Sequence, residues 1–145
     1  MHETIARRLV FHGALLFLIG LLTGLLIGLA RNTHMALSAH LEGVMNGTFL
    51  LVLGAAWGHV RLPPRAEKAA VGLLLYGTYV NWGTTLLSGM TGAGAKLLPL
   101  GGAGHHGPAW AEAVVPIGLV SLSIAMVLGV ALVVWGAARK VATQG

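Results

Sequence analysis

Residues 38–50, with the sequence SAHLEGVMNGTFL, are the stretch of this chain that decides its fold. They set His40, Glu42, Asn46 and Thr48 at the mouth of an apolar run that is long enough to cross a membrane. Polar and ionisable side chains are costly inside a bilayer, so they usually mark a functional site. The stretch therefore predicts a membrane-spanning helix that carries part of a functional site.

The composition of the whole chain agrees with a membrane protein. Of its 145 residues 56% are hydrophobic and 9% are charged, with a mean hydropathy of +0.81. A water-soluble domain of this size could not cover its surface with so few charges. A helix needs about 20 apolar residues to cross a bilayer. Four segments of that length predict an all-α integral membrane protein, a single-domain bundle of four transmembrane helices: 9–30, 41–60, 69–90 and 113–135.

The basic residues predict the orientation. Seven of the nine Lys and Arg residues lie at the N-terminus, in the second loop and at the C-terminus, whereas the first and third loops have one each. The positive-inside rule then places both termini in the cytoplasm. No basic run indicates a nucleic-acid partner. The seven are Arg7, Arg8, Arg61, Arg65, Lys68, Arg139 and Lys140.

Several kinds of chemistry are excluded by residue types that the chain lacks. Without cysteine there is no disulfide, thiolate nucleophile or thiolate metal site. Asp is absent as well, and no phosphate-binding loop, dinucleotide-binding glycine pattern or His-Glu-x-x-His motif is present. The side-chain acids are Glu3, Glu42, Glu67 and Glu112.

Polar residues gather on the side of the first and third loops, which predicts a pocket that opens there. Plainer interpretations exist for some of them, since histidines at helix mouths are often interfacial and Asn81 equally fits an interhelical hydrogen bond. The four tryptophans fit aromatic-belt anchors better than cofactor stackers. The polar residues are His34, His40, Glu42, Asn46, Asn81, Thr84, Thr85, Ser88, His105, His106 and Glu112, and the tryptophans are Trp57, Trp82, Trp110 and Trp135.

His40 has the most specific surroundings. On a helix Gly43 and Gly47 share its face and leave that face bare of side chains. A planar macrocycle could pack on such a strip while the imidazole binds its metal, so the three residues are candidates for cofactor binding. Asn46 lies about 9 Å further along the axis, within reach of a substrate held beside such a ring.

The same stretch resembles the second helix of the bacterial hydroxylaminobenzene mutases, and the likeness covers nearly the whole chain. It includes residues 12–24 (HGALLFLIGLLTG), 56–63 (AWGHVRLP), 75–82 (LYGTYVNW) and the Gly-His-His-Gly that begins at Gly104. Members of that family rearrange N-phenylhydroxylamine to 2-aminophenol without net redox change. The resemblance implies the same isomerisation, in nitroarene degradation, and a bacterial inner membrane.

A weaker likeness connects the chain to the styrene oxide isomerases, which are also small four-helix membrane proteins. Their Arg-x-x-x-His-Gly start is similar to residues 8–13, and their Ala-His-x-Gly-x-x-x-Asn-Gly pattern is similar to residues 39–47, with one more residue between His and Gly here. The resemblance implies haem b on His40, with His12 a further cofactor-binding candidate. It also implies that Asn46 orients the substrate and that the enzyme is a homotrimer.

The third helix departs from those isomerases. They have an Asp and a Tyr there, whereas this chain has no Asp, and Tyr76 and Tyr79 fall at shifted positions. The catalytic candidates are Glu42, Asn46, Tyr79 and Asn81.

The expected function is therefore conversion of an aryl hydroxylamine to an aminophenol with Lewis-acid catalysis by ferric haem. Two alternatives come from other classes of protein. One is a haem-binding electron-transfer subunit, which would use two axial histidines. The other is a small transporter or structural membrane protein with Glu42 as the coupling carboxylate.

Overall fold

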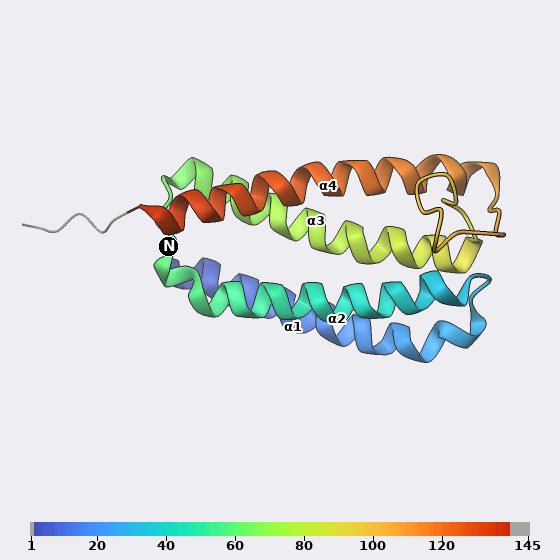
Figure 1. Ribbon diagram of the computed structural model, residues 1–145. Helices are drawn as coiled ribbons and strands as arrows, with labels where there is room; N and C mark the ends of the chain where they lie inside the picture. The colour runs from blue at the N-terminus through green and yellow to red at the C-terminus, as the bar shows by residue number, and fades with distance from the viewer. Residues whose placement is uncertain (1, 140–145) are drawn as a thin grey trace, which may run out of the picture.

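The computed structural model describes residues 2–139 and shows an all-helical chain, with no strand in that range, which confirms the predicted class. Four long helices run antiparallel to their neighbours along the chain (Figure 1). Lys140, one of the predicted basic anchors, lies outside the described residues. The elements are α1 (His2–Leu26), η1 (Ile27–Leu29), α2 (Thr33–Ala56), η2 (Trp57–His59), α3 (Pro64–Thr91) and α4 (Ala109–Ala138).

The helix ends follow from local sequence signals. The Asn32 side chain caps α2 by accepting the Met35 N–H at 3.1 Å. α3 begins at Pro64, whose fixed φ suits the first turn of a helix. It ends at Gly92, which takes the left-handed conformation at φ 77° that glycine adopts without strain. The helices α3 and α4 contain the whole of their predicted segments, whereas α1 and α2 begin seven and eight residues before theirs and end four residues earlier.

The helices form two hairpins, α1–α2 and α3–α4 (Figure 1). α2 packs along both α1 and α3, whereas α4 packs chiefly along α3. The start of α1, the α2–α3 connection and the end of α4 lie at one end of the molecule. The connections 27–32 and 92–108 lie at the other (Figure 1). The predicted four helices are present. The fourth helix packs chiefly on α3, whereas α1, α2 and α3 contact one another.

Three stretches are long and apolar enough to cross a membrane: Glu3–Leu29, Thr33–His59 and Ala109–Ala138. α3 is not among them, although the sequence predicts a fourth span there. Its first turns contain Arg65, Glu67 and Lys68, and its second half is rich in polar side chains. One of these polar side chains, that of Asn81, belongs to the site described below.

Glycine lets α1 and α2 approach closely. A Cβ atom built on Gly43 would lie 2.5 Å from Gly20 Cα, and one on Gly47 would lie 2.5 Å from the backbone nitrogen of Phe17. Gly13 is equally confined, because its Cβ would lie 2.7 Å from the backbone nitrogen of Leu51. Helices in lipid associate through small residues in this way. We call this contact the glycine seam.

The tryptophans do not all lie where the sequence predicts. Trp57 is completely buried, and its Nε1–H donates to Glu67 Oε1 at 3.2 Å; Glu67 itself is 1% exposed. Trp82 is half-buried among the helices. Only Trp110 and Trp135 are exposed as belt anchors are. The predicted belt role is therefore wrong for Trp57, since a buried carboxylate gives its indole N–H a partner inside the protein.

The glycine seam predicts opposite effects for two identical substitutions. Gly43→Ala should destabilise the fold by about 1–3 kcal/mol, because the new methyl group meets the α1 backbone. Gly72→Ala, on an exposed face of α3 with nothing within 4 Å of its Cβ position, should be neutral or stabilising by up to about 1 kcal/mol. Unfolding of both variants in detergent measures this. A Gly43→Ala protein as stable as Gly72→Ala would show that the seam is loosely packed.

Candidate active site

His40 lies at the end of the glycine seam with its ring against α1. Its Nδ1 is 2.8 Å from the carbonyl oxygen of Gly20. Because a carbonyl only accepts, Nδ1 carries the proton, and Nε2 of the neutral ring keeps its lone pair. Nothing in residues 2–139 forms a hydrogen bond with Nε2. A backbone carbonyl on one ring nitrogen with the other left open is the usual arrangement of a metal-binding histidine.

Gly24 makes room for this ring. A Cβ atom built there would lie 2.9 Å from His40 Nδ1 and 3.1 Å from Cε1, and the three atoms nearest to it all belong to His40. Gly24 is not among the site residues that the sequence motifs predict. The signal was present, because Gly20 and Gly24 are spaced four residues apart on one face of α1, opposite the predicted strip on α2.

Gly43 and Gly47, predicted to form a platform for a macrocycle, face α1 instead. Both are buried, and their Cβ positions are filled by backbone atoms of Gly20 and Phe17. The small residues are therefore used for helix–helix contact. Within this chain the strip supports His40 by bringing the Gly20 carbonyl to it, and it presents no flat open face.

Three of the predicted catalytic residues meet between α2 and α3, and we call them the acid–amide cluster: Glu42, Asn46 and Asn81. Asn81 Nδ2 donates to Glu42 Oε2, and Asn46 Nδ2 lies 3.4 Å from both Glu42 Oε2 and the carbonyl oxygen of Thr78. All three side chains are half-buried. Within the described chain Glu42 Oε1 and both amide oxygens have no donor. The cluster thus offers several acceptor oxygens.

Tyr79 and His12 form a separate pair that joins α3 to α1. The Tyr79 hydroxyl is 3.1 Å from His12 Nδ1 and donates to the His12 carbonyl oxygen at 3.4 Å. Along α1, His12 lies about 12 Å from Gly20, the residue that holds His40, at the usual rise per residue. The predicted cofactor histidines His12 and His40 therefore do not lie together in this chain.

Trp82, the residue after Asn81 on α3, packs against the glycine seam. Its Nε1–H donates to Thr23 Oγ1 at 3.0 Å, and its Cδ1 lies 3.1 Å from the Cβ position of Gly43. Thr23 is almost fully buried. The indole of Trp82 therefore joins α3 to α1 and packs against the glycine seam, a structural role that the sequence does not reveal because tryptophan is common at membrane interfaces.

The remaining polar residues of the predicted pocket mainly hold the loop 92–108. Glu112 accepts the backbone N–H groups of Gly94 at 3.1 Å and Gly107 at 2.9 Å. Ser88 donates to the Ala93 carbonyl at 2.6 Å, and Asn32, which is not one of the predicted residues, donates to the Gly101 carbonyl at 2.7 Å. His34 and His106 are exposed and His105 is partly exposed.

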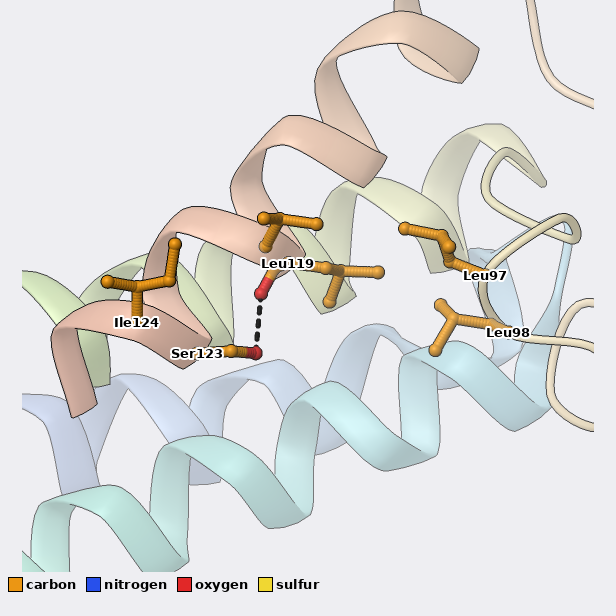
Figure 2. A pocket seen from close by; sticks show the side chains of 6 residues that line it. Leu97, Leu98, Leu119, Ser123 and Ile124 are labelled. Atoms are coloured by element: carbon orange, nitrogen blue, oxygen red, sulfur yellow. Dashed lines mark hydrogen bonds between the residues drawn. The ribbon is translucent and has the colours of Figure 1, made fainter. Parts of the chain in front are cut away.

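The same loop and α4 border an apolar hollow of about 420 Å³ (Figure 2). Its one hydroxyl, that of Ser123, donates to the carbonyl of Leu119 at 2.7 Å and is therefore already used. The hollow has no ionisable lining residue, so it can accept an apolar group but offers no acid–base chemistry. The lining residues are Leu97, Leu98, Leu119, Val120, Ser123 and Ile124.

The candidate ligands of the site suit a cofactor that needs a single side-chain ligand from the protein. In residues 2–139 no three or more His, Asp or Glu side chains gather as a metal site. A haem iron takes four nitrogens from its own macrocycle and needs only axial ligands from the protein. His40, with its open Nε2, meets that need.

Comparison with known proteins assigns the class. The profile of the styrene oxide isomerase family matches residues 5–138. The chain belongs to that family and is an isomerase. No solved structure matches it significantly.

Two relatives are mutases from Ectopseudomonas oleovorans. The chain is 48% identical to hydroxylaminobenzene mutase HabB over 132 residues, which cover 91% of this chain and 80% of the relative. It is 42% identical to hydroxylaminobenzene mutase HabA over 114 residues, 79% of this chain and 84% of the relative. The resemblance inferred from the sequence motifs is thus confirmed.

The contact between Gly24 and His40 gives a direct test of the site. Gly24→Leu should lower isomerase turnover by about a hundredfold, since displacing a reactive group by about 1 Å has effects of that size. Gly28→Leu, at a position with nothing within 4 Å, is the matched control and should stay close to wild type. Equal turnover in the two variants would mean that the position of His40 is unimportant for catalysis.

Proposed function

We propose that the protein is a membrane-bound mutase that converts N-phenylhydroxylamine to 2-aminophenol. The two mutase relatives support this reaction, and their names state the substrate on which they act. The observation that carries the proposal is His40, fixed through Nδ1 by the Gly20 carbonyl, on the same helix that supplies Glu42 and Asn46 to the acid–amide cluster. Such a site combines a ligand for an electrophilic metal with groups that handle protons.

We further propose that His40 holds haem b through Nε2. When bound, ferric haem supplies a Lewis acid that polarises the N–O bond without net redox change. The tautomer set by Gly20 suits this role, since the ligating nitrogen must be unprotonated.

The acid–amide cluster suits the substrate. An aryl hydroxylamine carries an N–H and an O–H donor, and the cluster presents free acceptor oxygens on Glu42, Asn46 and Asn81. We assign Asn46 and Asn81 to holding these two groups. Their own N–H₂ groups are occupied by Glu42 and Thr78, which fixes their oxygens in place.

Glu42 is our candidate for proton transfer. In the isomerisation the N–O bond breaks, a C–O bond forms at the ortho carbon, that carbon loses a proton and nitrogen gains one. A single carboxylate can take the proton from the ortho carbon and deliver a proton to the nitrogen. Glu42 is the one side-chain acid within this cluster, and its two amide partners keep it oriented toward α3.

The site lies within the membrane portion, which we propose includes α3 as a fourth span. The other three helices are apolar enough to cross, and α3 packs between α2 and α4. Burial of the reacting groups beside lipid keeps bulk water from the electron-poor ring, which favours return of the same oxygen. Tyr79 and His12 lie in the neighbouring α1–α3 contact, and we assign them to supporting the third helix.

We propose the same membrane orientation and the same oligomeric state that the sequence predicts. Basic residues are concentrated at the end of the molecule where α1 begins, so we place both termini on the cytoplasmic side of a bacterial inner membrane. The outward face of α4 carries large exposed hydrophobic side chains, among them Ile117 and Val127. Such a face suits lipid or other copies of the chain, and the homotrimer implied by the family remains our proposal.

The alternative functions find less support. An electron-transfer subunit would need a second axial histidine, and His12 lies about 12 Å along α1 from Gly20, the residue that holds His40. A transporter would need Glu42 free to exchange its proton with solvent, whereas two asparagines hold its carboxylate between helices.

Replacing His40 tests the cofactor and the function together. His40→Ala should lose the haem absorption band or shift it, and turnover of N-phenylhydroxylamine should fall by orders of magnitude, because polarisation of the N–O bond supplies several kcal/mol of the barrier. His34→Ala, an exposed histidine on the same helix, is the matched control. Visible spectra and product analysis of purified proteins measure both. Normal turnover in His40→Ala would contradict the proposal.

A second substitution isolates the proton-transfer role. Glu42→Gln keeps the size of the side chain but removes its base, so turnover should fall by roughly a hundredfold or more while haem content stays unchanged. Glu3→Gln makes the same chemical change at an exposed position near the start of α1 and should have no effect. If Glu42→Gln turns over at the wild-type rate, another group moves the proton.

A further inference from the structure

A pocket of about 370 Å³ lies at the end of the molecule opposite to the loop 92–108, where η2, the following loop and the end of α4 meet. Three of its five lining residues have basic side chains: His59 in η2, Arg61 in the loop after η2, and Arg139 at the end of α4. None of the five is acidic. We call it the basic pocket. It is lined by Gly58, His59, Arg61, Ala137 and Arg139.

The basic pocket is held in shape by backbone contacts. The Arg61 N–H donates to the carbonyl oxygen of Gly136 at 2.9 Å, which ties the α2–α3 loop to the end of α4. A Cβ atom on Gly136 would lie 2.7 Å from Val60 Cγ1 and 2.8 Å from Leu62 Cγ, so the loop is seated closely on the helix. The backbone of Arg61 is therefore fixed against the end of α4, three residues before Arg139.

An apolar track continues from the pocket along α4. Ala137, Val134, Val130 and Val127 recur at spacings of three and four residues, so they share one face of the helix. All four are exposed. The track extends from the basic pocket toward the middle of the span Ala109–Ala138.

Trp135 marks the level of the pocket. Its ring is about half exposed, and the Arg139 guanidinium lies 5.2 Å from the ring centroid. Exposed tryptophan is typical of the headgroup region of a bilayer. The cations of the pocket therefore lie at headgroup depth, with the apolar track directly beneath them.

We propose that the basic pocket binds the phosphate of an anionic phospholipid, whose acyl chains lie along the apolar track of α4. Two arginines offer several N–H donors to phosphate oxygens, and the pocket brings no competing carboxylate. Basic pockets at the cytoplasmic ends of membrane helices bind anionic headgroups in this manner. A free phosphate ion would use the same arginines but would gain nothing from the track. This site is independent of the proposed isomerase reaction.

Native mass spectrometry of the full chain in neutral detergent tests the proposal. Phosphatidylglycerol should add as a retained one-to-one adduct, phosphatidylcholine should bind more weakly, and excess inorganic phosphate should not displace the lipid. Displacement by inorganic phosphate, or equal binding of the two lipids, would overturn it in favour of a small-anion site or of unspecific lipid.

Charge-matched variants separate the pocket from the general positive charge of this end. Arg61→Gln with Arg139→Gln should weaken phosphatidylglycerol binding by about tenfold or more. Arg65→Gln with Lys68→Gln removes the same charge from exposed positions outside the pocket and should leave binding close to wild type. The single variants Arg139→Gln and Arg65→Gln serve the same comparison if a double variant does not fold. Equal weakening in both would overturn the proposal.

Discussion

The close approach of α1 and α2 is the constraint on which the rest of the structure depends. Gly20 and Gly43 meet backbone to backbone, and the same contact brings the Gly20 carbonyl within hydrogen-bonding distance of His40. In lipid, where burial of apolar surface gives helices little reason to associate, such packing between small residues holds them together. The seam thus stabilises the first hairpin and also sets which nitrogen of His40 stays open.

The seam also determines what α2 presents to α3. With His40, Gly43 and Gly47 turned toward α1, the intervening Glu42 and Asn46 face the third helix, where Asn81 meets them. One helix therefore carries His40 on one face and Glu42 and Asn46 on another. The third helix, which its polar residues set apart from the other three, contributes Asn81 to this cluster.

The long apolar segments were enough to predict four helices. The polar residues on the side of the first and third loops were enough to predict that Glu42, Asn46 and Asn81 lie in the same part of the bundle. Gly43 and Gly47 do not form the predicted platform for a macrocycle, because both pack against α1. Their spacing shows that one face of α2 has no side chains, but it does not show which part of the protein covers that face. The burial of Trp57 against Glu67 and the loop contacts of Glu112 were missed for a related reason. They depend on partners distant in sequence, and each residue type has a common interfacial role that fits equally well.

The central claim is that this isomerase moves one hydroxyl group within one aryl hydroxylamine molecule, shielded from water. The most direct measurement supplies the purified protein in ordinary water with N-phenylhydroxylamine whose hydroxyl carries a heavy oxygen isotope, and follows the label by mass spectrometry. The account predicts 2-aminophenol that retains the label. Label lost to water, a mixture of ring isomers, or no conversion would contradict it.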